Sequence, residues 1–348
     1  MSHIDIESRK IGPGQPTFVI AEIGVNHDGS VHRALELVRI ASTCGADAVK
    51  LQVFRAVNLV HVTSDLAEYQ RGRTSASNPV DLLKRYELPS AALRQVAKEI
   101  RQLNMIPLVT PFSPADMEVV ESMRVPAVKI ASPDMVNRPL LQAASQLGKP
   151  LLISTGGADM SEVETTVSWL SEWNVQFALM HCISAYPTPA SQANLCWIGE
   201  LARFGVPVGY SDHTTETACG ALSVAAGATV IERHLTYDRA AKGPDHAASS
   251  DPTQFQRYIR LVREADVLRG AAGKRVLQIE QDVRKVSRQS LVARRALEVG
   301  EVLREEDVTV QRPGTGVSAG EITKALGRRI IKPVTAGALM QWDMLDAA

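Results

Sequence analysis

Residues 206–212 read VPVGYSD and residues 229–235 read TVIERHL, two short apolar runs that both end in polar side chains. Apolar runs of this length, rich in β-branched residues, are typical of buried strands. Six similar runs precede them between residues 17 and 182: TFVIAEIG, DAVKLQVF, MIPLVTPF, PAVKIAS, PLLISTG and FALMHC. Longer stretches with helical periodicity separate most of them. This alternation predicts parallel strands closed into an α/β (β/α)8 TIM barrel, with an open doubly wound sheet as the alternative.

Two of the intervening stretches carry signals for the start of a helix. Ser161 and Glu164 form a Ser-x-x-Glu pair, which predicts a capping box at the start of SEVETTVSWL. Asp251 and Pro252 predict an N-cap followed by a first helical residue. No Gly-x-Gly-x-x-Gly follows the first run, so the sequence does not support a dinucleotide site.

Composition excludes several classes of protein. The chain has 348 residues with 38 basic and 38 acidic side chains, a balance that argues against nucleic-acid and membrane-surface proteins. It has no apolar run of membrane-spanning length, and its polar first ten residues are unlike a signal peptide. The four cysteines lack C-x-x-C spacing and lie among apolar or small residues, so we interpret Cys44, Cys182, Cys196 and Cys219 as reduced core thiols of a cytoplasmic protein.

The ends of the eight runs are unusually polar. In chain order they present Glu22, Lys50, Gln52, Thr110, Lys129, Ser132, Ser154, Thr155, His181, Ser211, His213, Glu232 and His234. Side chains two apart on a strand share a face, so Ser211 and His213 point together while Asp212 points away as an orienting partner. At the C-terminal ends of the strands of a closed barrel, the shared face lines the mouth, where TIM-barrel enzymes have their active sites. One charged end is typical of a solvated rim, but eight polar ends together predict a site.

Two histidines at neighbouring strand ends, His213 and His234, could hold a divalent cation. Two imidazoles completed by carboxylate and water oxygens suit Mn²⁺, Mg²⁺ or Fe²⁺ better than a structural zinc. An open coordination sphere would let the metal polarise a carbonyl group. The alternative is that both histidines bond to carboxylates of the rim without a metal.

Lys50 and Lys129, surrounded by hydroxyl groups, predict an anion site for phosphate plus carboxylate. The chain has no Walker loop, so a nucleotide is not the expected anion. Either lysine could instead form a Schiff base, as in class I aldolases. Asp245 and His246, in GPDHAASSDP after the last run, would lie over the mouth and could bind sugar hydroxyls.

Nine ordered motifs resemble the sialic acid synthase family, which includes N-acetylneuraminate, pseudaminic acid and legionaminic acid synthases. They are FVIAEIGVNHDGS, VKLQVF, TPFS, VKIAS, ISTGG, HCISAYPTP, GYSDHT, IERHLT and GPDHAASSDP. From about residue 285 the chain is similar to that family's antifreeze-protein-like (SAF) domain. We therefore expect a TIM-barrel catalytic domain at 1–270, a linker at 271–286 and a SAF domain at 287–348.

The resemblance implies a transferase that condenses phosphoenolpyruvate with an N-acetylated amino-sugar and releases phosphate by C–O cleavage. It implies that His213 and His234 bind a divalent metal, usually Mn²⁺, with Mg²⁺ or Co²⁺ as alternatives. It assigns Glu22, Lys50 and Asp134 to catalysis. The positions that match phosphoenolpyruvate contacts are Lys50, Thr110, Lys129, Ser132, Ser154, Ser184 and Ser211. The sugar-side positions are Gln52, Tyr186, Asp245 and Arg312, the last reaching the partner's active site in a domain-swapped homodimer.

Two departures from the family pattern fall on the sugar side of the expected site. Asp134 in SPDM stands where sialic acid synthases carry Glu, and Ser184 stands where they carry Asn. The acceptor is therefore left open between N-acetylmannosamine and the 2,4-diacetamido-6-deoxy hexoses of the pseudaminic and legionaminic branches. Two other functions also remain: a lysine-based aldolase that uses pyruvate, and a non-catalytic sugar-binding barrel.

Overall fold

The computed structural model describes residues 3–61 and 78–347. Its contacts divide the chain into two compact units, Met1–Ala271 and Ala272–Ala348.

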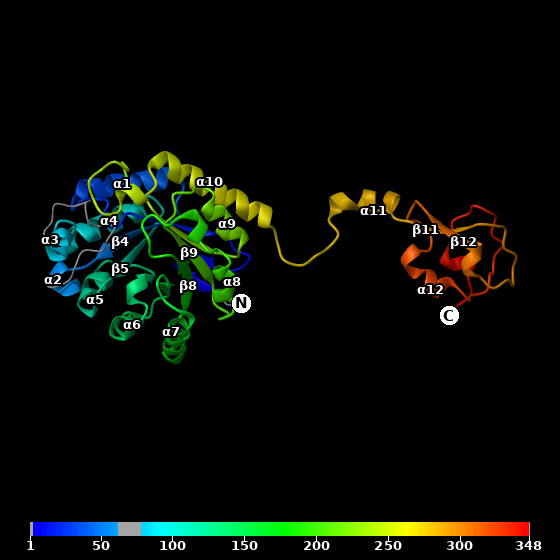
Figure 1. Ribbon diagram of the computed structural model, residues 1–348, viewed down its shortest axis with the longest axis horizontal. Coiled ribbons are helices and arrows are strands. Elements are labelled where there is room, and N and C mark those ends of the chain that lie inside the picture. Colours follow the sequence, from blue (N-terminus) through cyan, green and yellow to red (C-terminus); the bar gives the residue numbers. More distant parts are fainter. Residues whose placement is uncertain (1–2, 62–77, 348) are drawn as a thin grey trace. The chain divides into compact units, whose positions relative to one another are not determined.

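The first unit is a closed barrel of eight strands, each parallel to its neighbours, in the order β10-β3-β4-β5-β6-β7-β8-β9. The strands are β3 (Phe18–Glu22), β4 (Ala48–Val53), β5 (Ile106–Pro111), β6 (Val128–Ile130), β7 (Leu151–Ser154), β8 (Phe177–Cys182), β9 (Val208–Asp212) and β10 (Val230–His234). Helices surround them (Figure 1). The predicted (β/α)8 barrel is confirmed, and the open sheet is excluded.

The helices of the barrel unit fill the intervals between strands. They are α1 (Val31–Cys44), α2 (Ala56–Leu59), α3 (Pro79–Lys84), α4 (Ser90–Gln102), α5 (Met117–Ser122), α6 (Arg138–Ser145), α7 (Met160–Glu172), α8 (Trp197–Ala202), α9 (Cys219–Ala225) and α10 (Pro252–Arg269). The main apolar core lies between these helices and the outward faces of the strands. Among the described helices, none is long and apolar enough to cross a membrane.

A short antiparallel hairpin closes the N-terminal end of the barrel. Its strands, β1 (Ile4–Ile6) and β2 (Arg9–Ile11), contribute three buried isoleucines to a second core with residues of six barrel strands. That second core holds Ile4, Ile6, Ile11, Phe18, Ile20, Ala48, Ile106, Leu108, Ala127, Leu152, Ala178, Met180 and Val230. Among the described residues, the floor of the barrel is therefore apolar and filled, which leaves the opposite end for a site.

The helix-start predictions had different outcomes. Asp251 caps α10 and Pro252 is its first residue, as predicted. The capping box at Ser161 and Glu164 was wrong, because α7 begins earlier: the Asp159 carboxylate accepts a hydrogen bond from the Glu162 backbone and the Glu162 side chain accepts one from the Asp159 backbone. A charged carboxylate is the better partner for the free N–H groups of a first turn.

The cysteine prediction holds for three of the four residues. All four thiols are free, but Cys196 is exposed while Cys44, Cys182 and Cys219 are buried. Cys196 was expected in the core because apolar and small residues surround it in sequence. It directly precedes α8, a short helix that buries Ile198 and Leu201 instead.

The second unit has its own small core. Strand β11 (Ser290–Ala293) pairs antiparallel with β12 (Val308–Gln311), and α12 is Ile322–Ala325. The core contains Leu291, Ala293, Leu297, Leu303, Val308, Val317, Ala325, Ile330, Val334, Met340 and Leu345. The stretch expected to be a linker contains α11 (Gln281–Ser287), and the Lys285 carbonyl accepts a hydrogen bond from Gly314 N at 2.8 Å.

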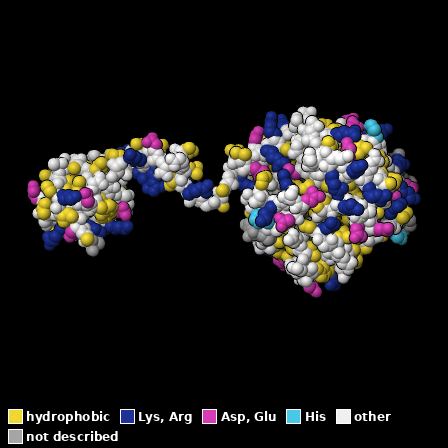
Figure 2. Space-filling view, turned by 180° about the vertical axis from the view of Figure 1, so that it is seen from behind, with side chains coloured by type: hydrophobic (Ala, Val, Ile, Leu, Met, Phe, Trp, Pro, Cys, Tyr) yellow, Lys and Arg dark blue, Asp and Glu magenta, His cyan; other side chains and the backbone are white. Residues whose placement is uncertain are grey.

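The charged side chains are mixed over the surface of the barrel unit. Figure 2 shows acidic and basic groups interspersed on the face in view, which is consistent with the zero formal net charge of the chain. No single-sign field of the kind that binds nucleic acid is visible on that face.

Candidate active site

A cavity of about 430 Å³ lies at the C-terminal ends of the barrel strands. Most of the side chains predicted for the site line it: Glu22, Lys50, Gln52, Thr110, Lys129, Ser132, Ser154, Ser184, Tyr186, Ser211, His213, His234 and Asp245. They come from all eight strands or the loops that follow them. The alternation of side chains therefore does bring the polar strand ends together at one mouth.

Two buried lysines and two buried carboxylates form the centre of the cavity. Lys50 Nζ lies 2.9 Å from Glu22 Oε2 and 3.6 Å from Glu232 Oε1, and Lys129 Nζ lies 3.8 Å from Glu232 Oε2. Glu232 therefore bridges the two ammonium groups. Burial alone would raise the pKa of Glu232, but Lys129 and Lys50 lower it to about 2. An anionic substrate would therefore bind to two ammonium groups that the Glu232 carboxylate already bridges.

Hydroxyl groups complete the surroundings of both lysines. Lys50 Nζ donates to Thr110 Oγ1 at 3.0 Å, and Lys129 Nζ donates to Ser154 Oγ at 2.6 Å. The two ammonium groups nevertheless differ in electrostatics. Burial lowers the pKa of Lys129 despite the attraction of Glu232, whereas Glu22 and Glu232 outweigh burial at Lys50 and raise its pKa. Lys50 is thus the more firmly charged of the pair.

Glu22 is suited to hold a proton. Its side chain is completely buried, and this burial raises its pKa, with Lys50 acting in the opposite direction. Gln52 Nε2 donates to Glu22 Oε1 at 2.9 Å and orients the carboxyl group. A buried carboxyl of raised pKa at the wall of a cavity is a candidate for general acid–base chemistry.

His213 and His234 lie side by side, with 5.5 Å between ring centroids. His213 Nδ1 donates to the Ile183 carbonyl at 2.8 Å, because a carbonyl oxygen can only accept. His234 Nδ1 lies 3.6 Å from Asp245 Oδ2. Burial and the neighbouring His213 lower the pKa of His234 well below its usual value, whereas Cys182 offsets burial and raises the pKa of His213 to about 9.

These two histidines fit a metal with an open coordination sphere. Among the described residues, no group of three or more His, Cys, Asp or Glu side chains is arranged as a preformed metal centre. The backbone bond at His213 Nδ1 orients the ring so that Nε2 is the nitrogen left for a ligand, as in many metal sites. Two imidazoles with Asp245 nearby suit a divalent cation that takes its other ligands from water and substrate.

Three predicted rim residues point away from the mouth. His181 faces the helix layer, where its Nε2 donates to the Ala193 carbonyl at 2.8 Å and its ring stacks on Tyr210. Thr155 donates to the Met180 carbonyl, and His246 is fully buried against Asp28 and Thr236. His181 and Thr155 were each assigned to the wrong face of the strand. The cavity is lined instead by Cys182, which follows His181, and by Ser154, which precedes Thr155.

Asp134 does not line the cavity, and Arg312 is not part of the barrel unit that contains it. Asp134 is half-buried in a turn after β6, where its Oδ1 accepts from Asn137 Nδ2 at 3.0 Å and burial raises its pKa. Its neighbours Ser132 and Pro133 do line it. Arg312 belongs to the second compact unit. The roles of Asp134 and Arg312 stay predictions.

The cavity also contains two side chains to which the sequence analysis assigned no role. Glu232 accepts from Ser211 Oγ at 3.0 Å in addition to bridging the lysines. Cys182 Sγ lies 3.7 Å from His213 Nδ1. Strand alternation had already placed Glu232 with the polar strand ends of the mouth, without a specific role, and it could have found Cys182, which pairs in register with Ser211. Asp212 points outward as expected, where Arg233 and Tyr258 donate to its carboxylate.

A parallel barrel with convergent charged groups at its C-terminal mouth has the architecture of the TIM-barrel enzymes. More narrowly, the chain belongs to the NeuB family, whose model matches residues 37–274, and residues 288–346 match the SAF domain. The resemblance to sialic acid synthases is thereby confirmed.

Three proteins show the range of the similarity. The N,N'-diacetyllegionaminic acid synthase of Legionella pneumophila is 35% identical over 97% of this chain and 96% of its own length. The human N-acetylneuraminate-9-phosphate synthase is 28% identical over 97% of this chain and 95% of its own. The crystal structure of N-acetylneuraminic acid synthetase from Leptospira borgpetersenii, in complex with citrate, matches with a TM-score of 0.73 and 31% identity over 81% of this chain and 95% of that one.

Proposed function

We propose that this protein is an enzyme that condenses phosphoenolpyruvate with an N-acetylated amino-sugar aldehyde to give a nine-carbon 2-keto-3-deoxy sugar acid. The observation that carries the proposal is the joint presence of Lys50, Lys129 and Glu232 with two histidines in one cavity at the barrel mouth. Relatives named as legionaminic, pseudaminic and sialic acid synthases support it.

The chemistry balances without an oxidant or reductant. C3 of phosphoenolpyruvate forms a bond to the aldehyde carbon, and the aldehyde oxygen takes up a proton to become a hydroxyl group. Water adds to the cationic C2 and loses a proton. The tetrahedral intermediate then expels phosphate by cleavage of the C2–O bond, and the proton of the C2 hydroxyl passes to the departing phosphate, which leaves a ketone. One group must therefore supply a proton and one must remove a proton from water.

The cavity residues can hold phosphoenolpyruvate and the sugar and can supply the proton. Lys50, Lys129 and the hydroxyl groups of Thr110 and Ser154 would hold the phosphate and carboxylate of phosphoenolpyruvate. Glu22, whose pKa is raised by burial, would donate the proton to the aldehyde oxygen. Ser132, Ser184 and Ser211 would complete the phosphoenolpyruvate side, and Gln52, Tyr186 and Asp245 the sugar side.

A divalent metal, Mn²⁺ in the first place with Mg²⁺ or Co²⁺ as alternatives, would be held by His213 and His234. When bound it would polarise the aldehyde carbonyl as a Lewis acid. Tyr186 would help to orient the acceptor, because its ring already packs 4.1 Å from the His213 ring.

We further propose a cytoplasmic, domain-swapped homodimer in which Arg312 reaches the site of the partner chain. Supporting this, Arg312 belongs to a compact unit separate from the one that contains the cavity. Mixing an Arg312→Ala chain with a Lys129→Met chain tests the idea. In a swapped dimer, one site of the mixed species carries both substitutions and the other carries neither, so activity should reappear on mixing.

The main test is a phosphate-release assay with Mn²⁺, phosphoenolpyruvate and a panel of amino-sugars that includes N-acetylmannosamine and 2,4-diacetamido-6-deoxy hexoses. The proposal requires release with at least one sugar and a product mass equal to acceptor plus phosphoenolpyruvate plus water minus phosphoric acid. If no sugar in the panel leads to phosphate release, the non-catalytic sugar-binding alternative is favoured instead.

One observation favours a second candidate, a pyruvate aldolase that works through a Schiff base. Burial lowers the pKa of Lys129, which is the property that an imine-forming lysine needs. Borohydride reduction in the presence of pyruvate separates the two functions, since covalent labelling of Lys129 or Lys50 would contradict the metal-dependent condensation.

A further inference from the structure

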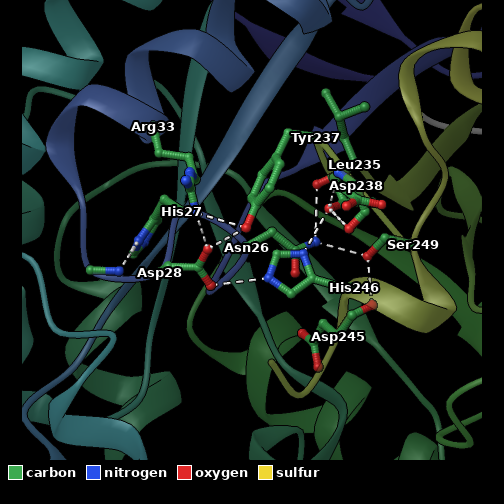
Figure 3. A network of polar contacts seen from close by, with 12 residues as sticks. Asn26, His27, Asp28, Arg33, Leu235, Tyr237, Asp238, Asp245, His246 and Ser249 are labelled. Carbon is green, nitrogen blue, oxygen red and sulfur yellow. Dashed lines mark hydrogen bonds and ion pairs between the residues drawn. The ribbon is translucent and has the colours of Figure 1, made fainter. Parts of the chain in front are cut away.

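Two loops meet beside the cavity and are joined by one carboxylate. Residues 23–30 follow β3, and residues 235–251 follow β10 and contain Asp245 (Figure 3). The Asp28 carboxylate accepts from His246 Nε2 at 3.0 Å, from Tyr237 OH at 2.8 Å and from Arg33 NH1 at 2.6 Å. We call these four residues, Asp28, Arg33, Tyr237 and His246, the clasp.

The histidine of the clasp is held on both of its nitrogens. His246 is fully buried, its Nε2 meets Asp28, and its Nδ1 lies 2.7 Å from Thr236 Oγ1. Gly243 packs directly against the ring: a Cβ added there would lie 2.6 Å from His246 Cδ2. The turn before His246 therefore depends on the position of that ring.

A second contact joins the same two loops. Asn26 is buried, and its Nδ2 donates to the Leu235 carbonyl at 3.0 Å and to Ser249 Oγ at 2.8 Å. Ser249 Oγ in turn donates to the Asp245 carbonyl at 2.8 Å. The loop after β10 is thus attached to the loop after β3 both at His246 and on the far side of Asp245.

Asp245 lies between these attachments and is the residue of its loop that combines a charge with access to the cavity. It lines the cavity next to Pro244, and its Oδ2 lies 3.6 Å from His234 Nδ1. The ring of its neighbour His246 points instead toward Asp28, into the clasp (Figure 3). Asp245 is therefore next in the chain to a residue that is fixed in the clasp and does not line the cavity.

We propose that Asp28 and His246 are positioning residues that fix the Asp245 carboxylate against the acceptor sugar. The inference rests on the proposed function for the identity of the ligand that Asp245 meets. A displacement of about 1 Å in such a group is enough to weaken a substrate contact strongly. The phosphoenolpyruvate side, on Lys50 and Lys129, is built from other strands and should not sense the clasp.

The test is Asp28→Asn in the full-length chain. The neutral amide has one acceptor oxygen where the carboxylate has two, so at least one of three donors loses its partner. We expect the KM of the acceptor sugar to rise about tenfold or more, with the KM of phosphoenolpyruvate changed less than about twofold. His246→Gln, which keeps an N–H donor toward Asp28, should lose less than His246→Ala.

Asp47→Asn is the matched control. The Asp47 carboxylate also accepts from several donors, Arg9, Arg263 and the Val19 backbone N–H, but it precedes β4, at the opposite end of the barrel. This variant should lower the melting temperature without changing either KM. If Asp28→Asn raises the acceptor KM no more than Asp47→Asn does, the clasp only stabilises the fold and the proposal is overturned.

A readout without turnover separates this inference from the proposed function. Hydrogen exchange of the backbone amides at 238–250 should become faster in Asp28→Asn and stay unchanged in Asp47→Asn. If exchange becomes faster in Asp28→Asn but the wild-type protein turns over no amino-sugar, the positioning of Asp245 is supported and the proposed synthase activity is overturned. If exchange is unchanged in Asp28→Asn and the wild-type protein is an active synthase, only the positioning role proposed for the clasp is overturned.

Discussion

The two ends of the barrel are made by the same eight strands and differ in almost every physical property. At the N-terminal end, Ile4, Ile6 and Ile11 of the hairpin pack on apolar strand residues and fill the interior. At the C-terminal end most inward strand positions are charged or polar, and they surround a cavity of about 430 Å³. The floor is held by burial of apolar surface, whereas at the mouth two lysines and two carboxylates lie buried close together.

Along each strand, the residues that stabilise the fold are therefore separate from the residues proposed for chemistry. Lys129 of β6 lies two residues from Ala127, which belongs to the floor core. Substitutions at the floor should therefore change folding, and substitutions at the mouth should change turnover. Four predictions test this separation.

The largest effect is expected at His234. Replacement by alanine removes one of the two imidazoles proposed to hold the metal, and turnover should fall at least about 1000-fold in a phosphate-release assay. A chelator should reduce the wild type to a similar level, and added Mn²⁺ should restore the wild type but not the variant. Unchanged turnover in His234→Ala would remove this residue from the metal site.

Lys129→Met comes next. Methionine fills most of the same volume but leaves Glu232 with only Lys50 as its cation. We expect kcat/KM for phosphoenolpyruvate to fall about 100- to 1000-fold. The free energy of unfolding should also fall, by up to about 3–5 kcal/mol, because Glu22 and Glu232 are left buried with one ammonium group between them. Lys98→Met, at an exposed position of α4, is the control and should change neither quantity. An unchanged kcat/KM in Lys129→Met would remove this residue from the proposed anion site.

The converse test is Ile6→Ala at the floor. Ile6 is fully buried in the hairpin core, so the truncation should lower the free energy of unfolding by about 2–4 kcal/mol in a urea titration. The kcat of the remaining folded enzyme should equal that of the wild type. A change in kcat at a temperature where the variant is fully folded would show that the floor and the mouth are coupled.

The smallest expected effect concerns a residue near the mouth that contributes to stability. Burial lowers the pKa of His27 to about 4 from an ordinary value of 6.5, and its Nδ1 accepts from Gly29 N. Because the unfolded chain then binds a proton more readily than the folded one, stability should decrease as the pH falls from about 6.5 to about 4.

Between pH 7 and pH 5 this proton uptake amounts to about 2 kcal/mol. His27→Asn keeps an acceptor for Gly29 N but does not titrate, so its unfolding free energy should depend less on pH in this range. Equal pH dependence in the two proteins would show that another group controls acid stability.

Much of the fold and most of the cavity could be predicted because both depend on local periodicity. Alternation on β9 placed Ser211 inward and Asp212 outward from sequence alone. It failed at β8, because His181 is the more conspicuous residue while Cys182 is the one in phase with the cavity. A histidine attracts a functional interpretation, and only the pairing of Cys182 with Ser211 corrects it.

The remaining errors depend on contacts between residues distant in sequence. His246 was expected over the mouth, but it is buried because Asp28, 218 positions earlier, accepts its Nε2–H. Glu232 was recognised as a strand end, yet its position between two lysines depends on the closure of the barrel. No local pattern encodes such a pairing. The role proposed for Arg312 depends on a second chain, because the ligand that it would contact is bound there.

The outward carboxylate of Asp212 has a consequence for how the barrel forms. It is buried with Arg233 and Tyr258 among the helices, while its neighbour Ser211 faces the cavity. A slip of β9 by one residue would exchange the two, leaving Arg233 without its partner in an apolar layer and placing a carboxylate beside Glu232. Such a misregistered chain would be both unstable and inactive. Correct pairing of β9 is therefore favoured by the same two neighbouring residues that face the cavity and the helix layer.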